Sequence, residues 1–325
     1  MRVIDIPGCD LQPSAVCLGG GPFGTEVTEE DAFVLLDAFF AAGGNFLDTA
    51  LVYGDWAATE RSVSEKIIGR WMRTRGVRED VIVGTKGGHP LLNRMDVPRL
   101  SPQEIISDLE ASLSHLQTDC IDIYWLHRDD PGRPVGDMLE TLEARVGRGC
   151  IRYYGCSNWT VSRIRQASEY ARAHGLRGFI ANQPMWSLAR PVRECLPDAT
   201  MAIMDEEGAA CHSSTGMAAI PYSAQAGGFF AKTERSGLDG LDENRRRLYG
   251  SAENEARSER AQNIAREWGT TVGSVALAFL MSQPFPVIPI IGAKDPRQLR
   301  DGLRAADLTL TAETLSYLTG PDALL

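Results

Sequence analysis

Short apolar runs alternate along the chain with segments whose apolar residues recur at helical spacing. The first unit shows the pattern: residues 15–19 form an apolar run, and the stretch from Thr28 to Gly43 carries apolar residues on one helical face. This pattern predicts a buried strand followed by an amphipathic helix. The unit repeats, and the expected strands are residues 15–19, 45–48, 81–85, 121–126, 153–157, 179–183, 218–222 and 287–291.

Capping signals mark the ends of several expected helices. Thr28 and Thr160 stand at N-cap positions, and Ser101 with Glu104 forms a capping box. A side-chain oxygen at the N-cap accepts a hydrogen bond from a first-turn amide that the helix itself leaves unpaired. These signals therefore predict where the helices begin.

The alternation of strands and helices favours one fold class. Eight such units over 325 residues predict an α/β protein, a closed (β/α)8 TIM barrel that forms a single domain over residues 1–325. An open doubly wound sheet is the alternative, and it requires a glycine-rich phosphate fingerprint after an early strand. The glycines at positions 19–21 do not have that spacing.

One segment departs from this rhythm. Residues 232–260 are charged and punctuated by glycine, so we expect a long irregular loop after the seventh strand. Such a loop is either a lid over a site or a solvated excursion, and composition does not separate the two. Residues 272–281 predict a buried helix before the eighth strand.

Composition and charge narrow the partners. A net charge of -10 opposes binding to nucleic acid, and no apolar run approaches the roughly 20 residues that cross a membrane. The seven cysteines are an odd number without Cys-x-x-Cys pairs, which is typical of reduced thiols in a cytoplasm. We therefore expect a cytoplasmic protein that binds a small molecule, with no nucleic-acid or membrane partner. The oligomeric state stays open.

Four polar side chains follow adjacent strands at the points where these strands end. Asp48 ends the second strand and Tyr53 follows it, Lys86 follows the third strand, and His127 follows the fourth. In a parallel barrel these strand ends meet on one face, where functional sites lie. Each residue alone is more simply explained as a structural or solvated group, but the four together predict a catalytic site.

The chemistry of these four groups suits proton transfer to a carbonyl oxygen. A free phenol has a pKa of about 10, and a lysine cation stabilises its phenolate, so Lys86 is expected to lower the pKa of Tyr53. Asp48 would keep Lys86 charged and in place. His127 would orient the carbonyl oxygen, to which Tyr53 gives its proton.

The chain resembles the aldo-keto reductase superfamily from about residue 16 to residue 302. The resemblance rests on motifs near the strand ends: Asn45-Phe46-Leu47-Asp48-Thr49-Ala50, Tyr53-Gly54, Thr85-Lys86, Leu126-His127, Gly155-Cys156-Ser157-Asn158, Asn182-Gln183-Pro184, Pro221-Tyr222-Ser223 and Ile291-Gly292-Ala293-Lys294. It implies a barrel enzyme with Asp48, Tyr53, Lys86 and His127 as its catalytic tetrad. It also implies a nicotinamide cofactor, because the tetrad has no hydride to give.

The resemblance further implies how this cofactor is held. Ser157, Asn158 and Gln183 would hydrogen-bond the carboxamide, and Trp186 would stack on the ring. Other contacts would come from the loops after the first, seventh and eighth strands, namely Gly20, Tyr222, Ser223, Ala224, Gln225, Gly227, Gly292, Lys294, Gln298 and Asp301. Lys294 would pair with a 2′-phosphate, which favours NADPH over NADH. Family members often have proline and leucine at positions 224 and 225, so the shape of this loop stays open.

Aromatic side chains near the strand ends define the expected substrate pocket, which is formed by Phe23, Trp56, His89 and Trp186. No arginine pair is evident for a substrate carboxylate or phosphate. Sugars, polycyclic ketones and aromatic aldehydes all stay open as substrates. Two functions fit: an NADPH-dependent oxidoreductase that reduces an aldehyde or ketone to an alcohol, reversibly in principle, or a cofactor-binding redox sensor or accessory subunit with little turnover.

Overall fold

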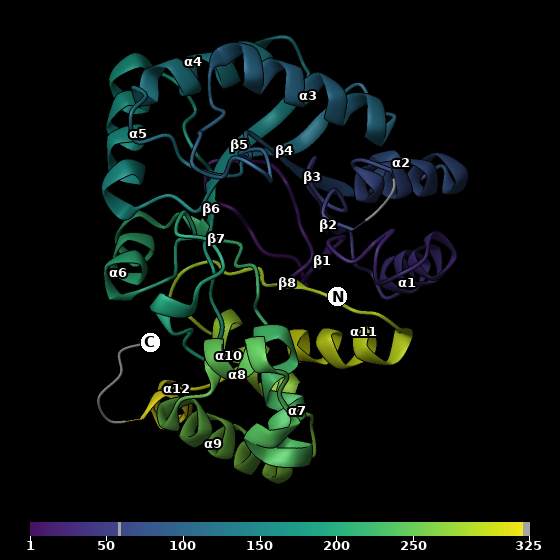
Figure 1. The fold of residues 1–325 in the computed structure, drawn as a ribbon, viewed down its shortest axis with the longest axis vertical. Coiled ribbons are helices and arrows are strands. Elements are labelled where there is room, and N and C mark those ends of the chain that lie inside the picture. Colours follow the sequence, from purple (N-terminus) through teal and green to yellow (C-terminus); the bar gives the residue numbers. More distant parts are fainter. Residues whose placement is uncertain (58–59, 321–325) are drawn as a thin grey trace.

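The computed structural model describes residues 1–57 and 60–320 of the chain (Figure 1). Within them, eight parallel strands form one curled sheet in the order β7-β6-β5-β4-β3-β2-β1-β8. The strands are β1 (Cys17–Gly19), β2 (Phe46–Asp48), β3 (Ile82–Gly87), β4 (Ile121–Leu126), β5 (Ile151–Ser157), β6 (Ala181–Gln183), β7 (Ala218–Ala219) and β8 (Ile290–Ile291). The sheet therefore confirms the predicted alternation, although several strands are shorter than expected.

Backbone hydrogen bonds join the two ends of this sheet. Ala219 donates to the carbonyl of Pro286 over 2.9 Å and accepts from the amide of Ile288 over 2.9 Å. The amide of Ile290 donates to the carbonyl of Pro221, also over 2.9 Å. Because the segment leading into β8 bonds to β7 while β8 itself pairs with β1, the arrangement is consistent with a (β/α)8 barrel.

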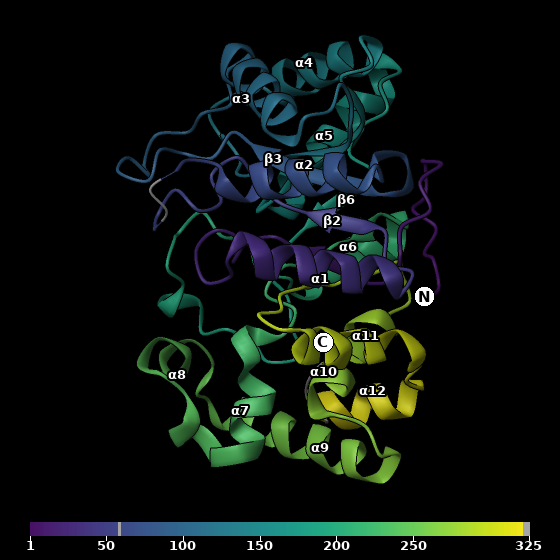
Figure 2. The same cartoon turned by 90° about the vertical axis from the view of Figure 1, so that its right-hand side faces the viewer.

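Helices cover the outside of the sheet (Figures 1 and 2). They are α1 (Glu29–Ala41), α2 (Val63–Arg75), α3 (Pro102–Leu116), α4 (Val135–Gly147), α5 (Val161–His174), α6 (Glu206–Thr215), α7 (Phe229–Ser236), α8 (Glu243–Tyr249), α9 (Ala252–Trp268), α10 (Val272–Met281), α11 (Pro296–Leu303) and α12 (Ala312–Thr319). In both views α7 to α12 gather on one side of the molecule, in the lower part of the figures.

The predicted N-caps are confirmed. The hydroxyl of Thr28 accepts from the first turn of α1, and Thr160 does the same for α5. Ser101 and Glu104 form both halves of the capping box at the start of α3. Each cap pairs an amide that the helix leaves free, so sequence alone locates these helix starts.

The prediction of an irregular loop over residues 232–260 is wrong. This segment lies largely in α7, α8 and α9, with a short 3-10 helix, η4 (Gly237–Gly240), between the first two. Asp242 caps α8 and Ser251 caps α9. The charges that suggested a loop lie mostly on exposed helix faces, while Phe230 on the inner face of α7 is buried. Charge and glycine therefore mark solvent-facing sides and helix ends here.

Buried side chains form two apolar clusters. The smaller cluster contains strand residues such as Phe46, Ile123 and Trp125, together with Ile6 and Leu11 from the N-terminal segment. The larger cluster contains the alternate strand residues and the inner faces of the helices. Since neighbouring strand residues point to opposite faces, the smaller cluster fills the inside of the curled sheet and the larger one packs the helices onto its outside.

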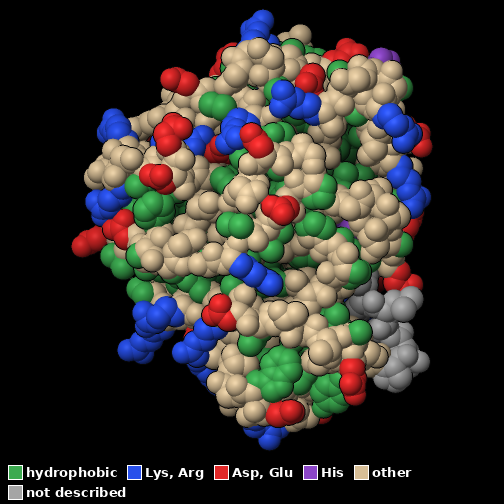
Figure 3. All heavy atoms as spheres, turned by 180° about the vertical axis from the view of Figure 1, so that it is seen from behind, with side chains coloured by type: hydrophobic (Ala, Val, Ile, Leu, Met, Phe, Trp, Pro, Cys, Tyr) green, Lys and Arg blue, Asp and Glu red, His purple; other side chains and the backbone are tan. Residues whose placement is uncertain are grey.

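Surface and thiol chemistry give the remaining global features. All seven cysteines are free thiols. Acidic and basic side chains are interspersed on the face shown in Figure 3. Over residues 1–57 and 60–320, every helix is too short or too polar to span a bilayer, and no three His, Cys, Asp or Glu side chains are grouped to hold a metal ion.

Candidate active site

Side-chain alternation along the strands brings distant residues together. Phe46 and Trp125 belong to the cluster inside the sheet, and Asp48 and His127 lie two positions after them. Because strand side chains repeat with a period of two, these two polar groups also point inward, at the carboxyl ends of β2 and β4. Lys86, near the end of β3, joins Asp48 by a direct hydrogen bond.

The ammonium group of Lys86 is the centre of this cluster. It lies 2.5 Å from Asp48 Oδ2, 2.7 Å from the carbonyl oxygen of Thr49 and 3.2 Å from the phenol oxygen of Tyr53. The side chains of Lys86 and Asp48 are each 2% exposed. An ammonium group has three donors, so all three have acceptors here and the side chain is held in one position.

Burial and charge oppose each other in this cluster. Burial disfavours the charge on Lys86, but Asp48 and Tyr53 outweigh it, so the pKa of Lys86 is raised and the amine stays protonated. Burial also raises the pKa of Asp48, although Lys86 and Gln183 favour its charged form. Lys86 thus persists as a buried cation.

The structure corrects the expected pKa of Tyr53. Burial raises the pKa of the phenol above its ordinary value, and the charge of Lys86 lowers it only in part. The direction expected of Lys86 is right, but the net direction is opposite because burial dominates. Tyr53 is therefore a protonated phenol across the physiological pH range.

Tyr53 reaches the cluster from the turn after β2. The turn is tight at Gly54, whose φ is 99° and where a Cβ atom would lie 2.3 Å from Val63. The ring of Tyr53 is half-buried, and Lys86 Nζ lies 4.7 Å from its centroid. Trp56, which is 54% exposed, packs edge-on against it at a centroid distance of 6.0 Å. The predicted pocket residue Trp56 thus borders the phenol.

His127 and His89 form the other side of the cluster. Their rings meet edge-on at 4.7 Å, and the ring of His127 lies 6.0 Å from that of Tyr53. Burial, followed by the charge of Arg128, lowers the pKa of His127 well below its usual value. The imidazole is therefore neutral, and its buried Nδ1 has no hydrogen-bond partner among the described residues.

Gln183 connects β6 to the cluster. Its Nε2 donates to Asp48 Oδ1 over 2.8 Å, which joins the ends of β6 and β2 across the inside of the curled sheet. Its Oε1 is buried and has no partner in the described part of the chain. A buried acceptor without a donor costs free energy, and a primary amide is a fitting donor for it. This acceptor matches the expected carboxamide contact.

Ser157 and Asn158 lie next to Gln183 but are already engaged. Ser157 donates to the backbone carbonyl of Gln183 over 2.9 Å. Asn158 donates to the carbonyl of His127 and to Ser157, and it accepts from the amide of Ala202 and from the hydroxyl of Tyr222. Asn158 therefore cross-links four segments at the strand ends, and any ligand contact by its amide requires exchange of one of these bonds.

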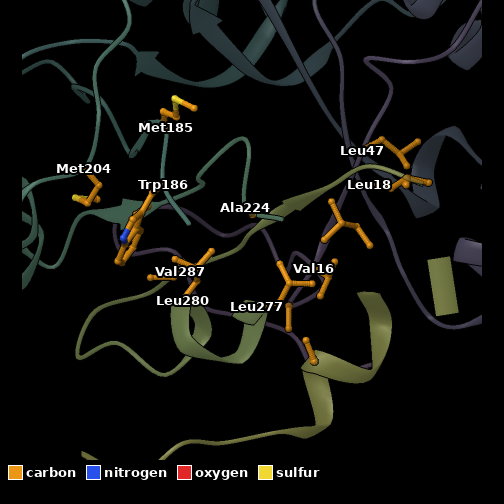
Figure 4. Packing of buried hydrophobic residues seen from close by; sticks show 14 of the residues in the cluster. Val16, Leu18, Leu47, Met185, Trp186, Met204, Ala224, Leu277, Leu280 and Val287 are labelled. Atoms are coloured by element: carbon orange, nitrogen blue, oxygen red, sulfur yellow. The ribbon is translucent and has the colours of Figure 1, made fainter. Parts of the chain in front are cut away.

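Two predicted ligand contacts are not supplied as expected. Trp186 is 4% exposed, and its ring packs in the core against Phe279 and Phe285. Figure 4 draws Trp186 among other buried apolar side chains of its cluster. Phe23 is 1% exposed within the same cluster. Neither ring offers a free face, because each packs outside the sheet. Tyr222, by contrast, is half-buried and bonded to Asn158.

The loop after β7 has a backbone suited to an anion. Ser223, Ala226, Gly227 and Gly228 all adopt left-handed conformations. Runs of such residues can turn successive amides toward one point and so form anion-binding concavities. The side chain of Ala224 is buried in the core, so only its backbone could contact a ligand.

The loops after β1, β7 and β8 contact one another. Gln225 accepts a hydrogen bond from the amide of Gly292 over 3.0 Å. Lys294 forms an ion pair with Glu26, and both side chains are more than half exposed. Gln298 accepts from the amide of Lys294 over 3.1 Å. The predicted cofactor residues of β7 and β8 are thus adjacent.

Other predicted positions have structural contacts. Gly20 is buried against Ser64, whose Oγ would lie 2.7 Å from a Cβ atom at that position. Asp301 is exposed and lies 3.8 Å from Arg304. Gly20 thus needs to be glycine for packing, whatever else it contacts.

Sequence reasoning missed three cations. Arg245 donates to the carbonyl of Gly227 over 2.7 Å, and Lys232 lies 3.8 Å from Asp242, which also pairs with Arg245. Burial, followed by the charge of Arg245, lowers the pKa of Lys232. Arg128 follows His127 directly and is 9% exposed. Lys232 and Arg245 fall in the segment expected to be a loop, and Arg128 follows His127 without a motif of its own.

A cavity of about 470 Å³ lies beside this site, between α5, α6 and the segment 199–205. Asn158 is part of its lining, but none of the four tetrad residues is. This cavity is therefore separate from the four residues predicted to be catalytic.

Comparison with known proteins gives matches that cover nearly the whole chain. The sequence model of the aldo/keto reductase family matches residues 15–322. The uncharacterized oxidoreductase YrpG of Bacillus subtilis is 31% identical over 316 residues, which cover 95% of this chain and 92% of the relative. The aryl-alcohol dehydrogenase (NADP+) of Phanerodontia chrysosporium is 31% identical over 343 residues, covering 96% and 83%. Norsolorinic acid reductase B of Aspergillus parasiticus is 31% identical over 330 residues, covering 96% and 81%. These matches confirm the resemblance carried by the strand-end motifs: the chain belongs to the aldo/keto reductase family.

Proposed function

We propose that this oxidoreductase uses NADPH to reduce an aldehyde or ketone to an alcohol, with Tyr53 as proton donor. The observation that carries the proposal is the placement of the phenol 3.2 Å from a buried lysine cation that Asp48 holds at 2.5 Å. A neutral phenol beside a fixed cation suits donation to an oxygen that gains negative charge, because the cation stabilises the resulting phenolate.

The residues present fit a nicotinamide cofactor. The free Oε1 of Gln183 is the complement of a carboxamide NH₂ group, and the left-handed loop at Ser223 to Gly228 suits a diphosphate. Tyr222 takes the ring-stacking role first assigned to Trp186, since Tyr222 is only partly buried whereas Trp186 lies in the core. One relative is named as NADP+-dependent, and Lys294 with the nearby Lys232 supplies the charge that a 2′-phosphate requires. These points support NADPH as the cofactor.

The tetrad divides the proton chemistry. When bound, the cofactor supplies the hydride for the carbonyl carbon. Tyr53 gives its proton to the carbonyl oxygen, and Lys86 stabilises the phenolate that remains. Asp48 keeps Lys86 fixed and charged through its 2.5 Å contact. Neutral His127 serves as a hydrogen-bond partner that orients the carbonyl oxygen. Because Tyr53 is protonated at neutral pH, the acid form that reduction needs is the populated form there.

Aromatic carbonyl compounds are the substrate class that we propose. Two relatives are named for aryl alcohols and norsolorinic acid. Trp56 and His89, which border the tetrad, offer flat surfaces on which an aromatic ring can pack. Phe23 and Trp186 leave the expected pocket because both are buried in the core.

A turnover assay tests the proposal. Purified protein is mixed with NADPH and a panel of aromatic aldehydes and ketones, and NADPH absorbance is followed, with cofactor binding measured separately by fluorescence. We expect NADPH consumption with at least one aromatic aldehyde. Tight NADPH binding without consumption across the panel would contradict the proposal and favour the redox sensor or accessory subunit.

The cytoplasmic location and the single-domain organisation stay proposals from the sequence.

A further inference from the structure

Arg128 is a buried cation next to His127. It is the residue directly after His127, and its Nη1 donates to the carbonyl of His127 over 2.9 Å. Burial, followed by the charge of Arg128, lowers the pKa of both His89 and His127, so the guanidinium acts on both rings. A cation in this place would attract an anionic group on a substrate packed against the histidines.

Asp198, in the segment after β6, forms an ion pair with Arg128. Its Oδ2 lies 3.1 Å from Arg128 Nη2 and 3.2 Å from Nε, and Thr200 Oγ1 accepts from the same Nε over 2.8 Å. The side chains of Arg128 and Asp198 are 11% and 16% exposed, so water screens the pair weakly.

Asp198 is also held in place without Arg128. Its Oδ1 accepts from the amide and the hydroxyl of Thr200, each over 2.8 Å. Burial alone would raise the pKa of Asp198, but these bonds and the charge of Arg128 lower it, so the carboxylate stays ionised. A substrate carboxylate would have to compete with a prepositioned carboxylate on the same guanidinium.

We propose that Arg128 and Asp198 form a charge selector in the substrate pocket, in which Asp198 neutralises Arg128 so that the site accepts uncharged carbonyl compounds and discriminates against those that carry a carboxylate. The inference rests on the proposed function and specifies its substrate class. Discrimination arises because Asp198 already occupies the guanidinium of Arg128, so that an incoming carboxylate faces another carboxylate. Asp198 is thus a specificity-determining residue, although it lies outside the tetrad.

The test uses two aldehydes of similar shape, 4-formylbenzoate and its methyl ester. For the wild-type protein with NADPH, we expect kcat/KM to favour the ester by roughly tenfold or more. Asp198→Asn keeps the shape of the side chain and removes the opposing charge, so we expect the ratio to move toward the carboxylate by roughly tenfold or more. Thr200→Val is the control for loosening of the segment, since it removes the hydroxyl that contacts both Asp198 and the guanidinium but keeps both charges and the backbone bond to Asp198. The ratio should stay within about twofold.

Two outcomes would overturn the selector. One is an unchanged ratio in Asp198→Asn while the ester is still reduced. The other is an equal shift in Thr200→Val, which would show that loosening of the segment, and not charge, sets the preference. Asp198→Ser, which keeps an oxygen for the amide of Thr200, replaces Asp198→Asn if thermal melting shows that the latter does not fold.

A binding measurement separates this inference from the proposed function. If the wild-type protein reduces neither aldehyde, the proposed function fails for this class of substrate, and the selector is then judged by fluorescence titration with benzoate and benzamide. Tighter benzoate binding in Asp198→Asn with unchanged benzamide binding would support the selector. Equal changes for both ligands would overturn it.

Discussion

The ammonium group of Lys86 donates a hydrogen bond to the phenol oxygen of Tyr53 over 3.2 Å. Its other two donors are taken by Asp48 and Thr49, so the cation cannot turn away from the phenol. This contact favours the phenolate after proton transfer, whereas burial keeps the phenol protonated before it. In the proposed reaction, Tyr53 would therefore keep its proton until a carbonyl compound accepts it, and Lys86 would stabilise the phenolate that is left.

Loss of the Tyr53 hydroxyl should abolish most activity. Tyr53→Phe keeps the ring that packs against Trp56, so we expect near-normal NADPH binding and a fall in carbonyl reduction by about 10² to 10⁴. Single-turnover kinetics with a deuterated cofactor would establish that hydride transfer is being measured. Tyr153→Phe, which removes a phenol bonded to Asp10 instead, is the control and should keep activity. More than about a tenth of wild-type activity in Tyr53→Phe would point to another acid, with His127 the first to examine.

Removing Lys86 should also destabilise the fold. Lys86→Met leaves the buried carboxylate of Asp48 with Gln183 as its side-chain donor among the described residues, and an unpaired buried charge costs about 3 to 5 kcal/mol. We expect a corresponding fall in the free energy of unfolding measured in urea. The double variant Asp48→Asn with Lys86→Met should recover much of the loss, because the uncompensated charge is gone. Equal instability of the single and double variants would argue against a charge effect.

The pH dependence follows from the directions of two pKa shifts. Burial raises the pKa of Tyr53 above 10, so the acid form that reduction needs is present below that pH and is lost above it. Burial and Arg128 move the pKa of His127 well below 6.5, so it does not change charge near neutrality. We expect kcat/KM for reduction to be flat from neutrality up to about pH 10, the ordinary pKa of a phenol, and to fall only at higher pH. Alcohol oxidation, which needs the phenolate, should rise with pH. An inflection in reduction near neutrality would contradict these assignments.

Cofactor choice should depend on the ion pair between Lys294 and Glu26. Lys294→Ala should weaken NADPH binding by about 1 to 3 kcal/mol and change NADH binding little, because only NADPH carries the 2′-phosphate. Glu26→Gln should do the reverse and tighten NADPH binding by a few tenths to about 1 kcal/mol, since the lysine loses a competing anion. Fluorescence titrations of both cofactors measure these effects. Equal losses for NADPH and NADH in Lys294→Ala would show that the lysine is structural.

Strand ends and helix caps were readable from the sequence because they depend on local pattern. Asp48 and His127 were found since each closes an apolar run, and Ser101 since its capping box is complete within four residues. The position of Trp186 was not readable, because a ring beyond a strand end can turn toward the site or toward the helices. Only packing against Phe279 and Phe285 decides it.

Ion pairs between residues far apart in the chain could not be predicted from the sequence either. The pairing of Arg128 with Asp198 joins residues far apart in the chain, and nothing in either local sequence marks it. The net rise in the pKa of Tyr53 is a further case, since burial is a property of the folded state and outweighs the lysine that the motif reveals.

The pairing of β8 with β1, which brings the two ends of the chain together, has a consequence for how the chain folds. Strands β1 to β7 pair with neighbours in sequence, but the pair of Cys17 with Ile290 joins nearly the two ends of the chain. Closing so long a loop costs entropy before any contact repays it, so we expect this pairing to form late. Until then β1 and β7 each present an open edge, and open edges pair with other chains. The short β8 therefore covers the open edges and limits aggregation during refolding. If β8 is weakened, the refolding yield should fall steeply as the protein concentration rises.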